Sequence, residues 1–218
     1  MTDHQNARIS SRKEPRQARS TDLVVAILEA AAQVLAKEGA ARFTTARVAE
    51  KAGVSVGSLY QYFPNKAAIL FRLQSEEWRR TSDLLCVILE DVRRPPLERL
   101  RALVHAFIRS ECEEAAMRVA LNDAAPLYRD APEARVARAS GNRAMRVFMA
   151  EALPRASEAT RALAADVITT TLSKVGKHVS ESPRTPAEIE AYAGAMADMF
   201  CAYLERQAQG SGDPVMGP

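Results

Sequence analysis

Apolar side chains recur every three or four positions along most of the chain, a spacing typical of amphipathic helices. One stripe begins at Leu23 and stops at Gly39, and another runs from Leu97 to Ile108. Only 9 glycines are present and alanine dominates many stretches, which disfavours a β-rich fold. We therefore predict an all-α fold of about nine helices, because capping and stop residues divide the pattern into that many segments.

Capping residues and prolines predict where these helices begin and end. Thr44 can cap a helix that runs through Ala52, and Gly53 ends it. Ser55 can cap a second short helix that runs through Tyr62. A long helix is expected over about residues 66–92, before Pro95 and Pro96, and the next carries the apolar stripe from Leu97 to Ile108. Three later helices are expected over about residues 130–153, before Pro154; 157–181; and 186–207, after the capping box Thr185-Pro186-Ala187-Glu188.

The same pattern predicts the organisation of the chain. Residues 1–20 are polar and lack periodicity, so we expect a disordered basic arm. Residues 21–68 are expected to form one helical domain, and residues 69–208 a second, larger helical domain. Residues 209–218 are expected to be a flexible tail. Residues 116–128 are only loosely patterned.

Charge is distributed unevenly along the 218 residues. The net charge is +3, but residues 1–80 carry 13 Lys/Arg and 8 Asp/Glu, whereas residues 81–218 carry 17 and 19. A basic segment can bind a polyanion, although such segments are also commonly just solvated. The basic excess therefore agrees with a nucleic-acid partner without requiring one.

Other classes of chemistry have little support in the sequence. The three cysteines are far apart and form no CxxC pair, so we expect reduced thiols and neither disulfides nor zinc. No metal-ligand spacing of histidines, no GxSxG, no HExxH and no phosphate loop is present. We expect no cofactor, no metal and no enzymatic activity. The first residues lack the apolar core of a signal peptide, and no apolar run is long enough to span a membrane.

The two short helices within residues 44–63 are the most informative segment. They meet at Ala52-Gly53-Val54, where Gly53 can adopt the left-handed backbone that a tight turn needs. In a helix-turn-helix the second helix enters the DNA major groove. A generic helical corner is the alternative interpretation. Helical spacing predicts packing positions Val48, Ala49, Val54 and Leu59. It leaves Ser55, Val56, Ser58, Tyr60, Gln61 and Tyr62 for the outer face, where hydroxyls and an amide suit phosphates and base edges. Tyr60 and Tyr62 could instead be core aromatics, but Leu59 and Phe63 already occupy the inward spacing, which favours exposure of Tyr60 at least.

A family resemblance extends over about residues 22–72 in one register. The segments Thr44-Thr45, Val48-Ala49, Ala52-Gly53-Val54-Ser55 and Gly57-Ser58-Leu59-Tyr60 are similar to the DNA-binding domain of the TetR family of transcriptional regulators. Ala26 to Leu28, Ala31-Ala32, Gly39, Tyr62-Phe63 and Lys66 extend the match. The resemblance implies an all-helical homodimer. It also implies that residues 21–68 are a helix-turn-helix DNA-binding domain and that residues 69–208 are an effector-binding and dimerisation domain, where a small effector commonly relieves repression.

The resemblance also implies roles for individual residues. Thr45, Tyr60 and Lys66 match phosphate-contacting positions of the family. Ala46 lies where some members place a base-reading arginine, so base recognition is expected to shift to Gln61, Tyr62 or Arg47. The complete predicted DNA-binding set is Thr45, Arg47, Ser55, Val56, Gly57, Ser58, Tyr60, Gln61, Tyr62 and Lys66.

The C-terminal part suggests two further sets of residues. Methionines and aromatics suit an adaptable effector pocket, but each of them also fits ordinary core packing. The candidate pocket residues are His105, Phe107, Met117, Asn122, Tyr128, Met145, Phe148 and Thr171. Apolar faces of the last two helices could pair with a second copy or pack within one subunit, and the resemblance favours pairing. The candidate interface residues are Leu163, Val167, Leu172, Tyr192, Met196, Phe200 and Tyr203.

The function expected from the sequence is a ligand-responsive transcriptional repressor. It would bind a palindromic double-stranded DNA operator as a homodimer and be released by a small apolar or amphipathic effector. The alternatives are an activator, or a sequence-neutral DNA-binding protein that uses the same domain. The expected location is the cytoplasm, in association with the nucleoid, and the basic arm could follow the minor groove.

Overall fold

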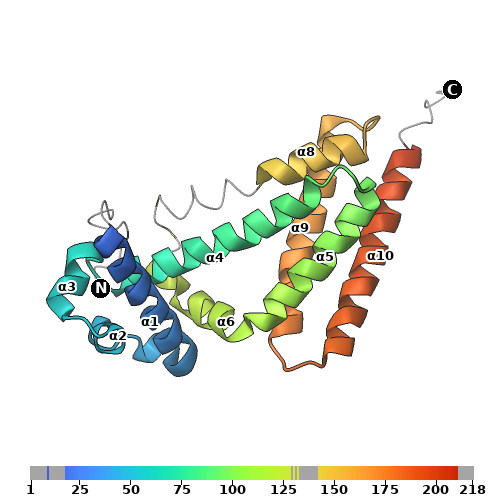
Figure 1. The fold of residues 1–218 in the computed structure, drawn as a ribbon. Coiled ribbons are helices and arrows are strands. Elements are labelled where there is room, and N and C mark those ends of the chain that lie inside the picture. The colour runs from blue at the N-terminus through green and yellow to red at the C-terminus, as the bar shows by residue number, and fades with distance from the viewer. Residues whose placement is uncertain (1–8, 10–17, 129, 131, 133–141, 211–218) are drawn as a thin grey trace. The chain divides into compact units, whose positions relative to one another are not determined.

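The computed structural model describes residue 9, residues 18–128, 130 and 132, and residues 142–210. These residues form nine α-helices and one 3-10 helix and contain no strand (Figure 1), which confirms the all-α prediction. The helices are α1 (Ala18–Arg42), α2 (Thr45–Ala52), α3 (Val56–Tyr62), α4 (Lys66–Leu89), α5 (Pro96–Glu113), α6 (Ala115–Ala124), the 3-10 helix η1 (Ala125–Leu127), α8 (Asn142–Ala152), α9 (Glu158–Ser180) and α10 (Pro186–Gly210).

The caps that the sequence predicts are present. The Thr44 side chain accepts a hydrogen bond from the Arg47 amide at the start of α2. Ser55 caps α3 through the Ser58 amide, and Ser157 caps α9 in the same way. Each cap satisfies one amide that lacks a partner in the first helical turn. Local sequence therefore determines where these helices begin.

The chain divides into two compact units. Unit 1 comprises Met1–Arg79 and Ala116–Ala139, and unit 2 comprises Arg80–Ala115 and Ser140–Pro218. Helix α4 contributes residues 66–79 to unit 1 and residues 80–89 to unit 2. These compact units do not coincide with the functional boundary expected after residue 68, which stays a prediction.

Unit 1 is built around the apolar side of α1. Ile27 and Leu35 are fully buried there, together with Leu59 of α3 and Ile69 of α4. Residues 116–124 of α6 and all of η1 belong to the same unit, and the Tyr128 hydroxyl that follows them donates to the Leu121 carbonyl at 2.9 Å. The segment that the sequence left loosely patterned is thus helical and part of this core.

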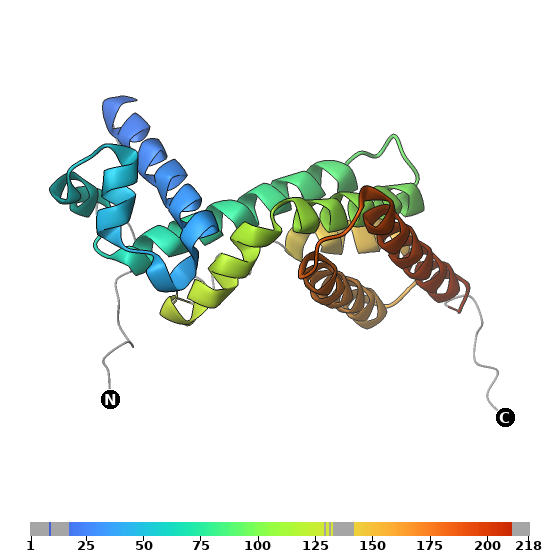
Figure 2. The same cartoon turned by 90° about the horizontal axis from the view of Figure 1, so that it is seen from below.

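Unit 2 is organised around α5, which packs against α8, α9 and α10 (Figure 2). The contact with α9 is close at Gly176, where an added Cβ would lie 2.8 Å from Phe107. The buried Arg99 on α5 pairs with Glu151 of α8 and donates to the Leu89 carbonyl at the end of α4 at 2.5 Å. This arginine joins three helices because its guanidinium carries several donors in one plane.

Several boundaries differ from the sequence-based expectation. Helix α4 ends at Leu89 rather than near residue 92, and α10 continues to Gly210, so residues 209 and 210 are helical rather than part of a tail. The rest of the expected tail, residues 211–218, lies outside the described residues. Of the expected disordered arm, residues 1–8 and 10–17 also lie outside the described residues, whereas residues 18–20 are helical and belong to α1. Ile9 is described and is 3% exposed within the core of unit 1, which contradicts a wholly solvated arm.

Candidate nucleic-acid interface

The turn between α2 and α3 fixes how the two short helices are arranged. Gly53 has φ 68° and ψ 30°, a left-handed conformation, and its amide closes the end of α2. The following Val54 amide donates to the Ala49 carbonyl at 3.0 Å. An added Cβ at Gly53 would meet nothing within 4 Å, so the backbone angle, and not space, is the reason for glycine here.

The inner sides of both helices are anchored in the core of unit 1. Val48, Ala49 and Leu59 are fully buried, as predicted, and Val54 is half-buried against the same core. Because α2 and α3 are too short to be stable alone, this burial is what holds them in place. The outer face of α3 is consequently presented on a fixed support.

The outer face carries the predicted hydroxyl groups in a specific arrangement. The Tyr60 hydroxyl lies 3.1 Å from Thr45 Oγ1, so the start of α2 and the middle of α3 are joined by one hydrogen bond. Ser55 Oγ and Ser58 Oγ lie 2.8 Å apart at the start of α3. Hydroxyls can donate to phosphate oxygens. Because one hydroxyl of the Thr45–Tyr60 pair donates to the other, the pair keeps one hydrogen for such a contact.

Most of the remaining predicted residues are also accessible. Val56, Gly57 and Gln61 are exposed on α3, and Lys66 is exposed in the first turn of α4. A cation near a helix N-terminus opposes the helix dipole, a cost that a bound phosphate would offset. The structure therefore gathers an amide, hydroxyls and a cation along one short stretch of unit 1.

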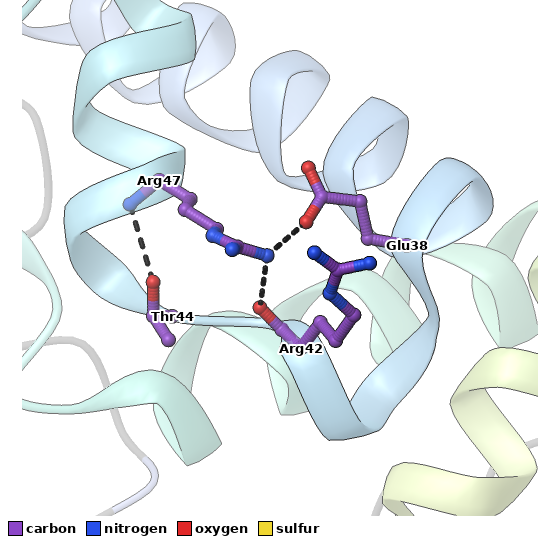
Figure 3. A network of polar contacts seen from close by, with 4 residues as sticks. All are labelled: Glu38, Arg42, Thr44 and Arg47. Carbon is purple, nitrogen blue, oxygen red and sulfur yellow. Dashed lines mark hydrogen bonds and ion pairs between the residues drawn. The ribbon is translucent and has the colours of Figure 1, made fainter.

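Arg47 lies in a network that the sequence did not predict (Figure 3). Its guanidinium forms an ion pair with Glu38 of α1, and it donates to the Arg42 carbonyl at 3.3 Å. Glu38 immediately precedes Gly39, where α1 departs from helical geometry with φ 74°. The guanidinium thus bridges the two sides of this kink. Sequence reasoning missed Glu38, because nothing in local spacing links it to Arg47.

Tyr62 is a correction to the expected outer face. Its exposed fraction is 7%, and it packs with Phe63 in the core of unit 1. Helix α3 has fewer than two full turns, so periodicity could not decide between the inward and outward orientation of its last residue. Its predicted DNA contact is untested, but the exposure on which that prediction depended is not observed.

Two family models match this chain. The model of bacterial regulatory proteins of the tetR family covers residues 27–73, which include α2 and α3. The tetracyclin repressor-like C-terminal domain covers residues 95–207, more than half of the chain. The chain belongs to the TetR family. The resemblance expected from the sequence is thereby confirmed, and the helix-turn-helix of this regulator is its DNA-binding domain.

This TetR-family chain is similar in part to curated nucleoid occlusion factors. The nucleoid occlusion factor SlmA of Vibrio campbellii is 39% identical over 83 residues, 38% of this chain and 42% of that protein. SlmA of Aliivibrio fischeri strain MJ11 is 55% identical over 42 residues, 19% of this chain and 21% of that protein. The chain therefore spans less than half the length of these curated relatives.

Solved structures of regulators share the fold over most of the chain. A regulator from Mesorhizobium loti has a TM-score of 0.67 at 18% identity, with 86% of this chain and 98% of that chain covered. The fatty acid degradation regulator FadR from Bacillus halodurans has a TM-score of 0.56 at 19% identity, with 94% and 100% covered. At these identities the likeness concerns the fold alone.

The predicted effector residues do not gather in one unit of this TetR-family chain. Met117, Asn122 and Tyr128 belong to unit 1, with Asn122 exposed and Tyr128 bonded within the core. The other five belong to unit 2, where Phe107, Met145 and Phe148 are buried in the core, Thr171 is half-buried and His105 pairs with Glu190 at 2.7 Å. A cavity within unit 2 is lined by none of the eight.

The predicted dimer residues separate into two groups. Leu172, Met196 and Phe200 are buried within unit 2, and Tyr203 is half-buried. Leu163, Val167 and Tyr192 are exposed. Met199, which is not among the predicted residues, is 51% exposed and follows Tyr192 by one heptad of α10. The interface itself stays a prediction.

Three further features concern the cysteines, metal-ligating side chains and membrane-spanning helices. All three cysteines are free, and burial raises the pKa of the Cys86, Cys112 and Cys201 thiols. Across the described ranges, no cluster of three metal-ligating side chains occurs. Within the same ranges, no helix has both the length and the apolar character to cross a bilayer.

Proposed function

We propose that this TetR-family protein is a ligand-responsive repressor that binds a palindromic operator as a homodimer and is released by a small molecule. The observation that carries the proposal is the capped helix-turn-helix, whose outer face presents the Thr45–Tyr60 hydroxyl pair and Gln61. The domain matched by the family model contains these residues. A repressor needs no catalytic group, only a surface whose affinity for DNA can be changed.

The roles within this surface follow from side-chain chemistry. Thr45, Tyr60 and Lys66 contact phosphates, because hydroxyls and a cation suit oxygens that carry no base identity. Gln61 contacts a base edge, because its amide can donate to and accept from adenine at once. Ser55 and Ser58 contact phosphates or bases next to these. Arg47 acts through its pair with Glu38 rather than by reading a base.

The homodimer is proposed to form through α9 and α10. Leu163 and Val167 lie one turn apart on α9, and Tyr192 and Met199 lie one heptad apart on α10. Four large exposed apolar side chains on two adjacent helices support a face that a second copy covers. A charge on this face, as in Met199→Glu, should give a monomer in sedimentation analysis.

The proposed release of DNA depends on the distance between the two recognition helices of the dimer. Two recognition helices fit successive major grooves only when they are about 34–36 Å apart. An effector that binds a differently spaced state more tightly shifts the population away from DNA. Helix α4 is the proposed lever, because it begins directly after α3 and continues through residue 89 into unit 2.

The experiment that tests the proposal is selection of bound sequences from random duplex DNA, followed by footprinting. A palindromic motif with half-sites about one helical turn apart supports it. Selection that returns no motif overturns it. A second arm measures operator binding by fluorescence anisotropy while candidate small molecules are added, and release without unfolding supports the effector step.

A second candidate is a nucleoid-associated protein that binds DNA with little sequence preference. The observation that favours it is the partial likeness to nucleoid occlusion factors. Such a protein would show a steep dependence of affinity on salt and a small ratio of specific to non-specific binding. An activator would instead show the palindrome together with increased transcription. As a repressor, an activator or a nucleoid-associated protein, the chain would act in the cytoplasm at the nucleoid.

A further inference from the structure

A cavity of about 770 Å³ lies within unit 2, where the last turns of α5 and α9 meet the start of α10. Its size falls in the range of about 300–1,000 Å³ that is typical of small-molecule sites. Ala115, Pro183, Pro186 and Ile189 provide apolar wall. The site therefore suits the apolar body of a small organic molecule, and its charged groups decide which class of molecule.

The two arginines that line the cavity are already engaged within the chain. Arg184 Nε donates to the Val179 carbonyl at 2.9 Å, and its guanidinium lies 4.7 Å from the ring centroid of Tyr192. Arg109 lies 3.7 Å from the carboxylate of Glu190. Arg184 is therefore held by its own partners, and the charge of Arg109 is offset by Glu190, which lines the same cavity.

The start of α10 is also occupied. A helix N-terminus is ordinarily the place where an anion binds. Here the Glu188 carboxylate fills it, accepting from the Thr185 amide at 2.7 Å and from the Thr185 hydroxyl at 2.9 Å. These hydrogen bonds lower the pKa of Glu188, so the internal anion stays charged at neutral pH. An anionic ligand would have to displace it.

The charges that remain at the cavity are negative. Glu113 and Glu181 both line it. Glu113 forms no ion pair with any residue that the structure describes. The ion-pair partner of Glu181 is the exposed His178 imidazole, which lies 3.8 Å away and does not line the cavity. The C-terminal ends of α5 and α9, which carry partial negative charge, lie at the same place.

The cysteine in the wall does not change this balance. Cys112 is half-buried, and burial, with the nearby Glu111 and Glu113 carboxylates adding to it, raises the pKa of its thiol despite Arg184. The thiol is therefore protonated at neutral pH and acts as apolar wall. It is not a nucleophile for a covalent ligand.

We infer that this cavity binds a small organic monocation with an apolar body, its charged group at Glu113 and Glu181 and its body against Pro183, Pro186 and Ile189. This inference rests on the proposed function for one point only, namely that an amphipathic amine is the effector that releases DNA. Binding of the amine itself needs no DNA and is tested separately.

Three probes with one apolar body and different charge test the inference. They are 2-(1-naphthyl)ethylamine, the neutral 2-(1-naphthyl)ethanol and the anionic 1-naphthaleneacetate. Binding to the full chain is measured by calorimetry and by shifts of the melting temperature. We expect the amine to bind most tightly and the anion least. Glu113→Gln should weaken the amine about three- to fivefold and leave the alcohol unchanged.

Two variants serve as controls for the location. Ser182→Trp places a large side chain on the exposed loop that lines the cavity and should abolish binding of all three probes. Glu205→Gln removes an exposed glutamate elsewhere on α10 and should leave binding unchanged. Circular dichroism establishes that each variant is folded.

The outcomes separate this inference from the proposed function. Tightest binding by the anion, equal response of Glu113→Gln and Glu205→Gln, or no binding of any probe overturns the cavity assignment. Amine binding that leaves operator affinity unchanged supports the cavity and overturns its role as effector site. Operator release by the amine that persists in Ser182→Trp overturns the assignment, because the amine then acts elsewhere.

Discussion

Replacing Tyr60 by phenylalanine tests whether the hydroxyl pair contacts the DNA backbone. The change removes one oxygen, which lies 3.1 Å from Thr45 Oγ1, and leaves the partly exposed ring in place. An exposed hydrogen bond contributes little to folding, so the free energy of unfolding should change by less than about 0.5 kcal/mol. A hydrogen bond to a charged phosphate is worth about 1.5 kcal/mol or more, so affinity should fall about tenfold per half-site.

Salt dependence separates this hydroxyl from a cation. Tyr60→Phe releases no counterion, so the slope of log affinity against log salt should stay the same. Lys66→Ala should flatten that slope by about 0.9 per protomer, because it removes one phosphate-neutralising charge. Both changes should weaken operator and random duplex DNA alike. Fluorescence anisotropy over a series of salt concentrations measures all of these quantities.

A double-mutant cycle with Thr45→Val examines whether the two hydroxyls act together. If they bind one phosphate, the double variant should lose less affinity than the sum of the single losses. Additive losses would show that the hydroxyls act independently. A change in preferred bases, with binding to random DNA intact, would refute the backbone role of Tyr60 altogether.

Three further predictions concern stability. Gly53→Ala should cost about 1–2 kcal/mol in denaturant unfolding, because a side chain disfavours φ 68°, and Gly53→Asn should cost less. Gly176→Ala should cost about 1–3 kcal/mol, because its Cβ would lie 2.8 Å from Phe107, and Phe107→Leu in the same chain should recover part of it. Glu188→Gln should lower the melting temperature at neutral pH. The pKa of Glu188 is lowered in the folded protein, so the stabilisation by its carboxylate is present at neutral pH and is lost as the pH falls through this pKa. The melting temperatures of wild type and variant should therefore converge in acid, and a constant difference between them would contradict this.

Local signals allowed the sequence to predict much of the fold. The caps at Thr44, Ser55 and Ser157 and the turn at Gly53 depend on residues within one helical turn of each other, and all four are present. Helical periodicity likewise placed Leu59 in the core. Such features need no knowledge of distant packing, which is why a single sequence contains them.

The parts that the sequence could not predict depend on contacts between distant segments. The pairing of Arg47 with Glu38 arises because α1 bends at Gly39 and brings its end beside α2. The effector residues were chosen by composition, and composition does not reveal that Met117 and Met145 belong to different units. The cavity was missed because the segments around it are far apart in sequence and polar in part.

The arrangement of the DNA-binding face has a consequence for specificity. Of the three side chains expected to read bases, Tyr62 is buried and Arg47 is engaged by Glu38, which leaves Gln61. One bidentate amide discriminates by about 1–3 kcal/mol, whereas specific regulators exceed non-specific binding by about 4–10 kcal/mol. A single recognition helix of this kind would therefore discriminate poorly. Under the proposed function, selectivity comes from doubling the contact in a symmetric dimer and from DNA shape. On this reasoning, loss of dimerisation should reduce selectivity far more than any single substitution on α3.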